Sequence, residues 1–350
     1  MMKIRIYSRD MSFIGQIENV FSLQWTRKFT SCGEFEAHLP LSAYNVKILK
    51  KENLFYLKGK KECGIIEDIE IAYEKSKKEI TVKGRFASSY FYRRIIKGTY
   101  NFNGRVEASM RELVAQASIP NVVLGADHGY TDKIQYQATY KNILTYIEKL
   151  SQCSDIGFRL RPDFDNKKWI FETYKGTDRS AEQYDVPRVI FSQKLGDVEK
   201  ATYKTNSKTY ANVCYVGGQG EGSARQVEVT GETDLSGLDR REIFINGSDI
   251  SKENLSDAEY RALLIERGNS TLNSNALAES LEKEDKVKGN YNYPDDYDLG
   301  DIVTNKLEYW GISSSDRVTE VNEVYEHGTM KAVPTFGTPL ADTIDWSDNL

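Results

Sequence analysis

The sequence predicts a β-dominated α+β fold, with strands toward both ends of the chain and helices between them. Apolar and polar residues alternate with a period of two through much of the first hundred residues, which is typical of half-buried antiparallel strands. Two stretches in the middle carry apolar residues three and four positions apart, as amphipathic helices do. A second region of period-two alternation then follows, interrupted by one more helix.

Residues 1–98 are expected to form a small β-barrel or sandwich. Alternating apolar and polar residues fill 3–7, 68–74 and 79–83. The polar stretch 74–78 joins the last two and has the composition of a hairpin loop. This pattern indicates an antiparallel sheet with one face buried and one face in water.

Residues 99–185 are expected to form an α/β unit. One amphipathic helix is predicted from Val106 to Ala117 and another from Thr139 to Ser154. A short strand is predicted between them at 121–125. A hairpin from Phe158 to Phe171 then closes the unit.

The last part of the chain is expected to hold a second β domain with a helical insertion. Ser256 and Glu259 have the S-x-x-E spacing of a capping box, in which each side chain satisfies an amide left free at a helix start. A leucine stripe extends this predicted helix to about Glu284, with Gly268 as a weak point. The expected domain boundaries are 1–98, 99–185, 186–235 together with 285–333, 236–284 for the helical insertion, and 334–350 for an extended or frayed C-terminal tail.

Length and composition exclude several classes of protein. At 350 residues, with 39% hydrophobic and 28% charged residues, the chain is long enough for roughly two to three domains. It has no apolar run of about 20 residues, so we expect no membrane anchor. Its start, Met1 to Ile6, lacks the apolar stretch of a signal peptide, and synthesis in a cytoplasm is expected. The four cysteines are scattered, without a C-x-x-C pair.

The net charge of -5 conceals a split along the chain. Residues 1–100 carry a net +8, residues 101–235 carry -1, and residues 236–350 carry -12. A split of this kind fits a basic nucleic-acid or membrane patch, or surfaces of opposite sign that meet between subunits. Two unrelated solvated surfaces fit it equally well.

The sequence lacks the common catalytic signatures. It has no G-x-S-x-G elbow, H-E-x-x-H, Walker A or deaminase motif. The histidines His38, His128 and His327 stand in unrelated contexts and leave little imidazole for general-base or metal chemistry. We therefore expect no catalytic residue, no metal ligand and no cofactor. A Cys–His nucleophile or a carboxylate pair assembled by folding stays open.

A glycine-rich stretch from residue 217 to 222 is the first candidate site. Its amides could cradle a phosphate, but strand-like residues 225–230 follow it instead of a helix, and Ser223 replaces the third glycine of G-x-G-x-x-G. A mobile hairpin tip that reaches a neighbouring subunit is the favoured interpretation. The candidate contact residues are Gly217, Gly218, Gly220 and Gly222.

An acidic turn at residues 295–301 is the second candidate site. Its four carboxylates invite comparison with a calcium loop, but Gly300 stands where an EF-hand needs its fifth-position oxygen ligand. A solvated turn before a strand at 302–304 is favoured over a non-standard Ca²⁺ site. The candidate contact residues are Tyr297, Leu299, Gly300 and Asp301.

Cations surround aromatic residues in two stretches, 47–61 and 85–97. Aromatic platforms between cations suit single-stranded nucleic acid. However, alternating cations are usually the wet face of a strand, and the chain as a whole is acidic. A nucleic-acid-binding module is therefore the less favoured interpretation.

Three stretches resemble the siphovirus-type tail hub family of bacteriophages and prophages. They are Tyr215 to Arg225, Tyr297 to Val303, and Val318 to Tyr325. The chain is also similar to the amino-terminal hub part of tail-associated lysins, and the likeness covers nearly the whole chain. No catalytic residue is carried over, because the common domain of the family is structural.

The resemblance implies a structural baseplate or tail-tip hub in a virion or a phage-tail-like particle. Such hubs are homotrimers in which two tail-tube-like β-barrel domains per subunit form a pseudo-sixfold ring. The ring joins a tail tube or distal tail protein to a spike, fibre or tail-tip protein, and DNA passes its channel only as cargo. The basic first barrel and the acidic last one are then expected to abut between subunits.

Two other functions remain as alternatives. One is a tail-associated cell-wall hydrolase, either a glycosidase or a peptidase, which would need carboxylates or a Cys/His or metal group in a cleft. The other is a glycan- or nucleic-acid-binding module, favoured by the 22 tyrosines.

Overall fold

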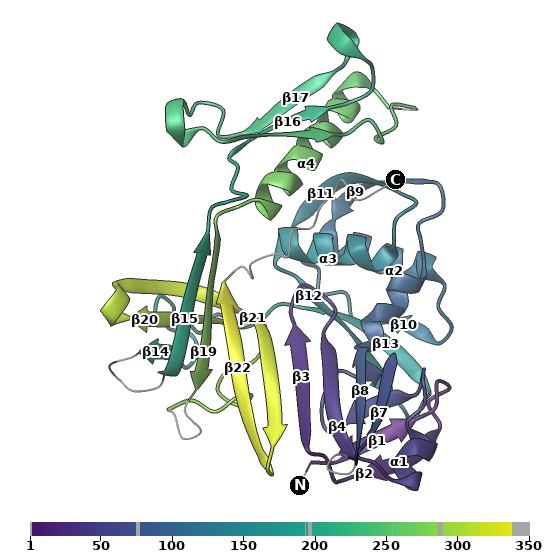
Figure 1. Cartoon of the computed structure of the whole chain (residues 1–350). Helices are drawn as coiled ribbons and strands as arrows, with labels where there is room; N and C mark the ends of the chain where they lie inside the picture. The colour runs from purple at the N-terminus through teal and green to yellow at the C-terminus, as the bar shows by residue number, and fades with distance from the viewer. Residues whose placement is uncertain are drawn as a thin grey trace.

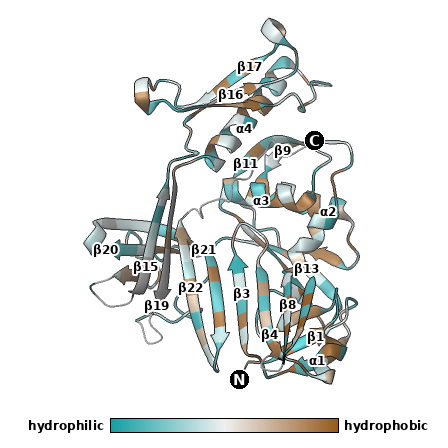
Figure 2. Ribbon diagram, in the orientation of Figure 1, coloured by the Kyte–Doolittle hydropathy of each residue, from teal (hydrophilic) through white to brown (hydrophobic). Residues whose placement is uncertain are grey.

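A computed structural model describes residues 2–74, 78–192, 194, 198–253, 255–285 and 290–337. It confirms the β-dominated α+β class, with 42% of the residues in strands and 21% in helices. The described strands form five sheets, of which the largest has ten strands (Figure 1). Hydrophobic and hydrophilic residues alternate along strands of this sheet (Figure 2), as half-buried strands require.

The first β segment contributes to two sheets that pack over one core. The smaller sheet has the order β2 (Phe13–Ile17), β1 (Ile4–Tyr7), β5 (Leu54–Leu57) and β6 (Gly64–Ile65). The larger sheet contains, in spatial order, β3 (Ser22–Lys28), β4 (Glu34–Pro40), β8 (Lys78–Arg85) and β7 (Asp68–Tyr73). Two short helices complete the segment, α1 (Ala43–Ile48) and the 3₁₀ helix η1 (Ala87–Arg93).

The middle of the chain folds as two short sheets and two helices. The strands β9 (Thr99–Arg105) and β11 (Lys133–Thr139) pair, and β13 (Lys168–Tyr174) lies between β10 (Val122–Leu124) and β12 (Gly157–Asp163). The helices are α2 (Val106–Ala117) and α3 (Ile143–Ser154). The first helix has its predicted bounds. The second begins at Ile143 instead of Thr139, because Thr139 ends β11 and pairs with Thr99.

The last β segment extends the same large sheet. Strand β21 (Ile312–Glu326) pairs with β20 (Ile302–Leu307) through its first half and with β22 (Thr329–Gly337) and β3 through its second. The remaining strands are β14 (Ile190–Ser192), β15 (Val198–Asn206) and β19 (Ala278–Asp285), with the 3₁₀ helix η4 (Glu308–Trp310). Because β3 pairs with β21, the two β segments share one sheet within a single chain.

A separate three-stranded sheet, covered on one face by α4, projects from this body (Figure 1). Its elements are β16 (Val213–Gly217), β17 (Val227–Gly231), β18 (Glu242–Asn246), α4 (Asp257–Ser274), and the 3₁₀ helices η2 (Gly222–Ala224) and η3 (Gly237–Asp239). The expected second β domain of 186–235 and 285–333 includes β16 and β17, but these two strands pair with each other and with β18 and do not join the large sheet. Period-two alternation identifies a strand but not the sheet that it joins, and the Cys214 and Val216 side packs against α4.

Helix α4 begins as predicted but ends early. The Ser256 side chain accepts a hydrogen bond from the Glu259 amide, and the Glu259 carboxylate accepts one from the Ser256 amide at 2.8 Å. The helix ends at Ser274 instead of about Glu284, because Ser and Asn at this end favour caps over helix interiors. Gly268 is a close-packing position: a Cβ there would stand 2.5 Å from Thr230 Cγ2.

The first residues of the predicted C-terminal tail, 334–350, belong to a strand. Residues 334–337 complete β22, where Pro334 pairs with Val321 and Phe336 is fully buried. Residues 338–350 lie outside the described residues.

Candidate functional site

The glycine-rich stretch forms the turn between β16 and β17. Gly217 and Gly218 are buried, whereas Gly220 and Gly222 are exposed. The φ angles of Gly220 and Gly222 are 104° and 54°, in the left-handed region that glycine adopts without steric cost. The tip at residues 219–224 is therefore the part of the loop that can meet another molecule.

Arg225 and Tyr260 fix the base of this loop. The Arg225 guanidinium donates to the carbonyl oxygens of Gly217 at 2.9 Å and Gly218 at 3.0 Å. The Tyr260 hydroxyl, from α4, accepts a hydrogen bond from the Gln219 amide at 2.7 Å. A Cβ on Gly218 would stand 2.5 Å from that hydroxyl oxygen. The base of the loop is thus anchored to α4, which differs from the expectation of a hairpin tip that is mobile as a whole.

The acidic turn packs inside the C-terminal β segment. Tyr297, Leu299 and Asp301 are only 1%, 4% and 6% exposed. Gly300 is buried with φ 95°, and a Cβ there would lie 2.7 Å from the Phe29 ring. The expectation of a solvated turn is therefore wrong for residues 297–301, because these side chains complete the core. Their contact with a partner subunit stays a prediction.

Hydrogen bonds within the chain occupy the Asp301 carboxylate. It accepts from the Thr177 amide at 2.7 Å, from Arg179 Nε at 3.0 Å and from the Asp298 amide at 3.1 Å. These donors occupy three of the roughly four lone-pair sites of the carboxylate. In the part of the chain that the structure describes, no group of three His, Cys, Asp or Glu side chains could hold a metal ion.

A buried charge cluster, which the sequence patterns did not reveal, joins the two β segments. Arg27 occupies the inward position of β3 that follows Leu23 and Trp25, and it is only 4% exposed. Its Nε donates to Glu62 at 3.0 Å, and its Nη1 donates to Asp298 at 2.6 Å. One feature of the sequence could have indicated this cluster: Arg27 is a cation on the apolar side of a strand in which apolar and polar residues alternate.

Glu323 of β21 extends this cluster. Its carboxylate is fully buried and accepts hydrogen bonds from the hydroxyls of Tyr293 at 2.7 Å and Tyr325 at 2.6 Å. Lys60 Nζ lies 2.6 Å from the same carboxylate. The Tyr293 hydroxyl also accepts from Arg27 at 2.5 Å, so the two halves of the cluster are connected. Because buried ions must be paired, this cluster favours one register between β3 and β21.

Burial and neighbouring charges both shift the pKa values of the groups in this cluster. Burial alone would lower the pKa of Arg27, but Glu62, Tyr293 and Asp298 raise this pKa well above its ordinary value. Burial is also the main reason that the pKa of Tyr293 is raised. At neutral pH the cluster therefore contains a charged guanidinium and a neutral phenol.

The basic aromatic stretches place most of their rings in the core. Phe55, Phe86 and Phe91 are 0%, 4% and 0% exposed. Arg93 donates two hydrogen bonds to Glu52, at 2.6 and 3.0 Å. These three rings therefore offer no stacking surface, which weakens the nucleic-acid alternative.

Comparison with known families supplies the deciding observation. The model of a family described as "Siphovirus ReqiPepy6 Gp37-like protein" matches residues 3–338. The chain belongs to this family. A comparison with curated proteins found no match.

Three solved structures share the fold of this chain. The 43 kDa tail protein of prophage MuSo2 from Shewanella oneidensis is 12% identical, with a TM-score of 0.61 over 96% of this chain and 98% of that one. The tail protein from Neisseria meningitidis MC58 is 11% identical, with a TM-score of 0.60 over 96% of each chain. Prophage tail protein gp18 from Listeria monocytogenes EGD-e is 10% identical, with a TM-score of 0.57 over 95% and 94%. At these identities the likeness establishes the fold alone.

The family match confirms the resemblance to a phage tail hub-type protein, and the shared fold agrees with it. The chain is thus a member of a siphovirus protein family and shares the fold of prophage tail proteins. None of its helices, over the described ranges, is both long and apolar enough to cross a membrane.

Proposed function

We propose that this chain is the hub of a phage tail or a related tail-like particle. Three copies form a pseudo-sixfold ring that joins a sixfold tail tube or distal tail protein to a threefold spike, fibre or tail-tip protein. The observation that carries the proposal is the family match over residues 3–338. The continuous sheet formed by the first and last β segments supports it, because one subunit then supplies two β modules held in fixed relation.

The large sheet has two edge strands that suit the joints between subunits of a ring. Its outermost strands in the path are β7 and β15, and each pairs on one side only among the described strands. Two different edges on one subunit allow head-to-tail joints, and such joints generate a closed ring when the rotation per subunit closes. The ring encloses a channel through which DNA passes as cargo, and the hub itself performs no chemistry.

Mass measurement and electron microscopy test this proposal together. The purified chain should have the mass of a trimer in analytical ultracentrifugation, and antibody labelling should place it at the tail tip of native particles. A stable monomer that is absent from the particles would refute the hub. Clearing of peptidoglycan by the purified chain would instead favour a cell-wall hydrolase.

The glycine loop offers a more local test of assembly. Glu221 is exposed at the loop tip, so Glu221→Lys should impair particle assembly and leave the unfolding midpoint of the purified chain unchanged. Gly218→Val is the matched control for the loop base, because its side chain would collide with Tyr260 and should lower the stability of the chain itself. Normal particles from Glu221→Lys would remove the tip from the assembly contacts.

A further inference from the structure

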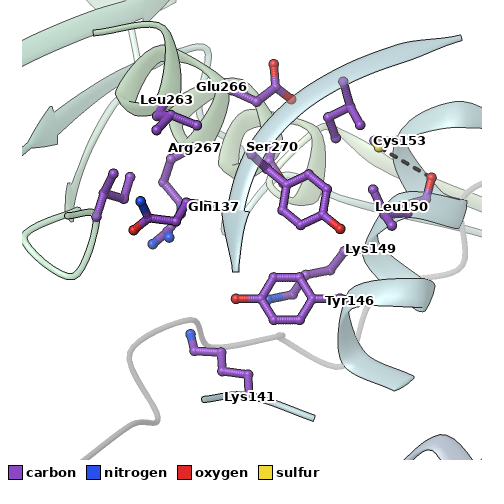
Figure 3. A pocket seen from close by; sticks show the side chains of 13 residues that line it. Gln137, Lys141, Tyr146, Lys149, Leu150, Cys153, Leu263, Glu266, Arg267 and Ser270 are labelled. Carbon is purple, nitrogen blue, oxygen red and sulfur yellow. Dashed lines mark hydrogen bonds between the residues drawn. The ribbon is translucent and has the colours of Figure 1, made fainter. Parts of the chain in front are cut away.

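Two pockets lined by cations differ in the space that they enclose. One lies between α3, β11 and α4, where packed side chains leave a cavity of only about 60 Å³ (Figure 3). A cavity of that size holds a few water molecules and no larger ligand. The other, which we call the turn pocket, has a volume of about 500 Å³. Ligand sites commonly have volumes of about 300–1,000 Å³, so the turn pocket has room for a small molecule.

Three turns and the end of η1 form the turn pocket. The turns join β1 to β2, α2 to β10, and β12 to β13. Lys167 Nζ, from the third turn, donates a hydrogen bond to Ser12 Oγ of the first at 2.8 Å. The rings of Tyr7 and Phe164 stack next to these turns, with their centroids 3.8 Å apart. These contacts hold the first β segment and the α/β unit in a fixed relation at the pocket.

The backbone of two of these turns adopts an uncommon conformation. Met11 has a φ of 62° and Lys167 has a φ of 53°, both in the left-handed region that residues other than glycine rarely adopt. Residues of this kind are concentrated at binding sites, where the surrounding structure holds them in place.

The lining of the turn pocket contains four cations and one carboxylate. Two of the cations are compensated: Arg93 binds a carboxylate outside the pocket at 2.6 Å, and Lys167 Nζ lies 3.7 Å from Asp10. Hydrogen bonds from the Ser8 and Ser12 hydroxyls lower the pKa of Asp10 to about 2. Asp10 is therefore charged at neutral pH and neutralises Lys167.

The other two cations have no carboxylate partner in the described part of the chain. Arg94 Nη1 donates to the carbonyl oxygen of Arg93 at 3.0 Å, a contact that leaves the guanidinium charge unbalanced. Arg9 forms neither a hydrogen bond nor an ion pair with the described residues. Both side chains are exposed, so a ligand can reach them. The turn pocket thus presents two positive charges that its own chain does not balance.

Neutral donors and an aliphatic wall complete the lining. The Tyr90 hydroxyl is buried without a hydrogen-bond partner among the described residues, and burial raises its pKa, so it stays protonated. The Trp169 indole packs edge-to-face on the Tyr90 ring, with the centroids 5.7 Å apart. The aliphatic wall consists of Met11, Ile119 and Pro120. The turn pocket therefore offers many donors and few acceptors, as a site for an anion requires.

The charge balance favours a phosphate over a carboxylate. A phosphate monoester carries a charge of about -1.5 to -2 at pH 7, which matches the two unbalanced guanidinium groups. A carboxylate carries only a single negative charge. Guanidinium groups also bind phosphate oxygens through paired N–H donors, and this geometry suits both arginines.

We propose that the turn pocket binds a phosphate monoester. Arg9 and Arg94 bind the phosphate oxygens, and the aliphatic wall contacts the organic part of the ligand. This inference goes beyond the hub function and does not depend on it, because it concerns one pocket of one chain.

Isothermal titration calorimetry of the full-length chain tests the proposal with inorganic phosphate, adenosine monophosphate and glucose 6-phosphate. We expect all three to bind at a single site, and the esters to bind more tightly because they also contact the aliphatic wall. The tighter of the two esters shows whether the organic part is a nucleoside or a sugar.

A double variant and a matched control locate the binding site. Arg9→Gln/Arg94→Gln should weaken binding of each probe by at least about tenfold, because it removes the charge-assisted hydrogen bonds. Lys83→Gln is the control and should bind as the parent chain does. Lys83 lines a different pocket, where it is paired with Glu36 at 2.9 Å. Arg9→Gln alone keeps the test valid if the Arg94 substitution disturbs folding, because Arg9 binds no described residue.

Three results would overturn the proposal. The first is the absence of binding at millimolar phosphate in a chain whose unfolding midpoint is normal. The second is equal affinity of the parent chain and the double variant, which would place the phosphate elsewhere. The third is binding of acetate as tight as that of inorganic phosphate, which would show a site for carboxylates.

Discussion

At the residue scale, the most informative departure from simple patterning is the inward-facing arginine of β3. Strand alternation places residue 27 on the side of Leu23 and Trp25, and a cation there needs compensation. Glu62 and Asp298 supply it from loops that are distant in sequence. The pairing could not be predicted from the sequence, because it depends on which loops the fold brings to the end of β3.

Replacing Arg27 by methionine should strongly destabilise the chain. The substitution leaves the buried Glu62 carboxylate without its partner, and removing one member of a buried ion pair costs about 3–5 kcal/mol. Urea unfolding should show a loss of this size. Lys28→Met is the matched control, because Lys28 binds the exposed Glu34 at 3.1 Å and such pairs contribute at most about 1 kcal/mol. Equal losses in the two variants would contradict this account.

Glu148 of α3 should make stability depend on pH. Its carboxylate accepts a hydrogen bond from the Cys32 amide at 2.9 Å, and burial raises its pKa above the ordinary 4.5. A carboxyl whose pKa is raised by folding binds its proton more tightly in the folded state. Its contribution is therefore most favourable below pH 4.5 and is lost as pH rises through the folded-state pKa.

The variant Glu148→Gln keeps an acceptor for the Cys32 amide and removes the charge. It should be more stable than the parent chain at pH 7, and this advantage should disappear below about pH 4. Urea unfolding at the two pH values measures the difference. The exposed Glu70→Gln is the control and should show no such crossover. A parent chain that is more stable at pH 7 would contradict the prediction.

At the element scale, local signals predicted helices better than they predicted strand partners. The capping box fixed the start of α4, because both hydrogen bonds are made by residues three positions apart. The end of α4 depends on tertiary context as well as on the Ser and Asn residues there: Leu281, which was expected in the helix, packs into the core as part of β19. The strands at 213–217 and 227–231 were recognisable from their alternation, but their separate sheet was not.

The cap of α4 provides a test at this scale. Ser256→Ala removes the acceptor for the Glu259 amide and should cost about 1 kcal/mol of helix stability. Hydrogen exchange of the α4 amides should accelerate by about fivefold, while exchange in β21 and β3 stays unchanged. Ser274→Ala, at the exposed end of the same helix, is the control. Unchanged α4 exchange in Ser256→Ala would show that packing alone sets the stability of this helix.

At the scale of the whole molecule, the charge split has a partial explanation within one chain. Three contacts join basic residues of the first segment to acidic residues of the last: Arg27 to Asp298, Lys60 to Glu323 and Lys28 to Glu320. The charge split alone left several interpretations open, and the family resemblance implied that the basic and acidic segments abut between subunits. The structure shows a meeting within the chain, and the contact between neighbouring subunits stays a prediction.

Salt should separate the contact within the chain from the contact between subunits. Glu323 is fully buried, and salt screens buried pairs little. Charges that face each other across a solvated ring joint are screened as the Debye length falls from about 10 Å at 0.1 M to about 3 Å at 1 M salt. Raising NaCl from 0.1 to 1 M should therefore reduce the trimer fraction in sedimentation by several-fold and leave the urea midpoint of the monomer nearly unchanged. A trimer that resists 1 M NaCl would show that apolar contacts hold the ring together. The other charged residues of the first and last segments would then lie on solvated surfaces.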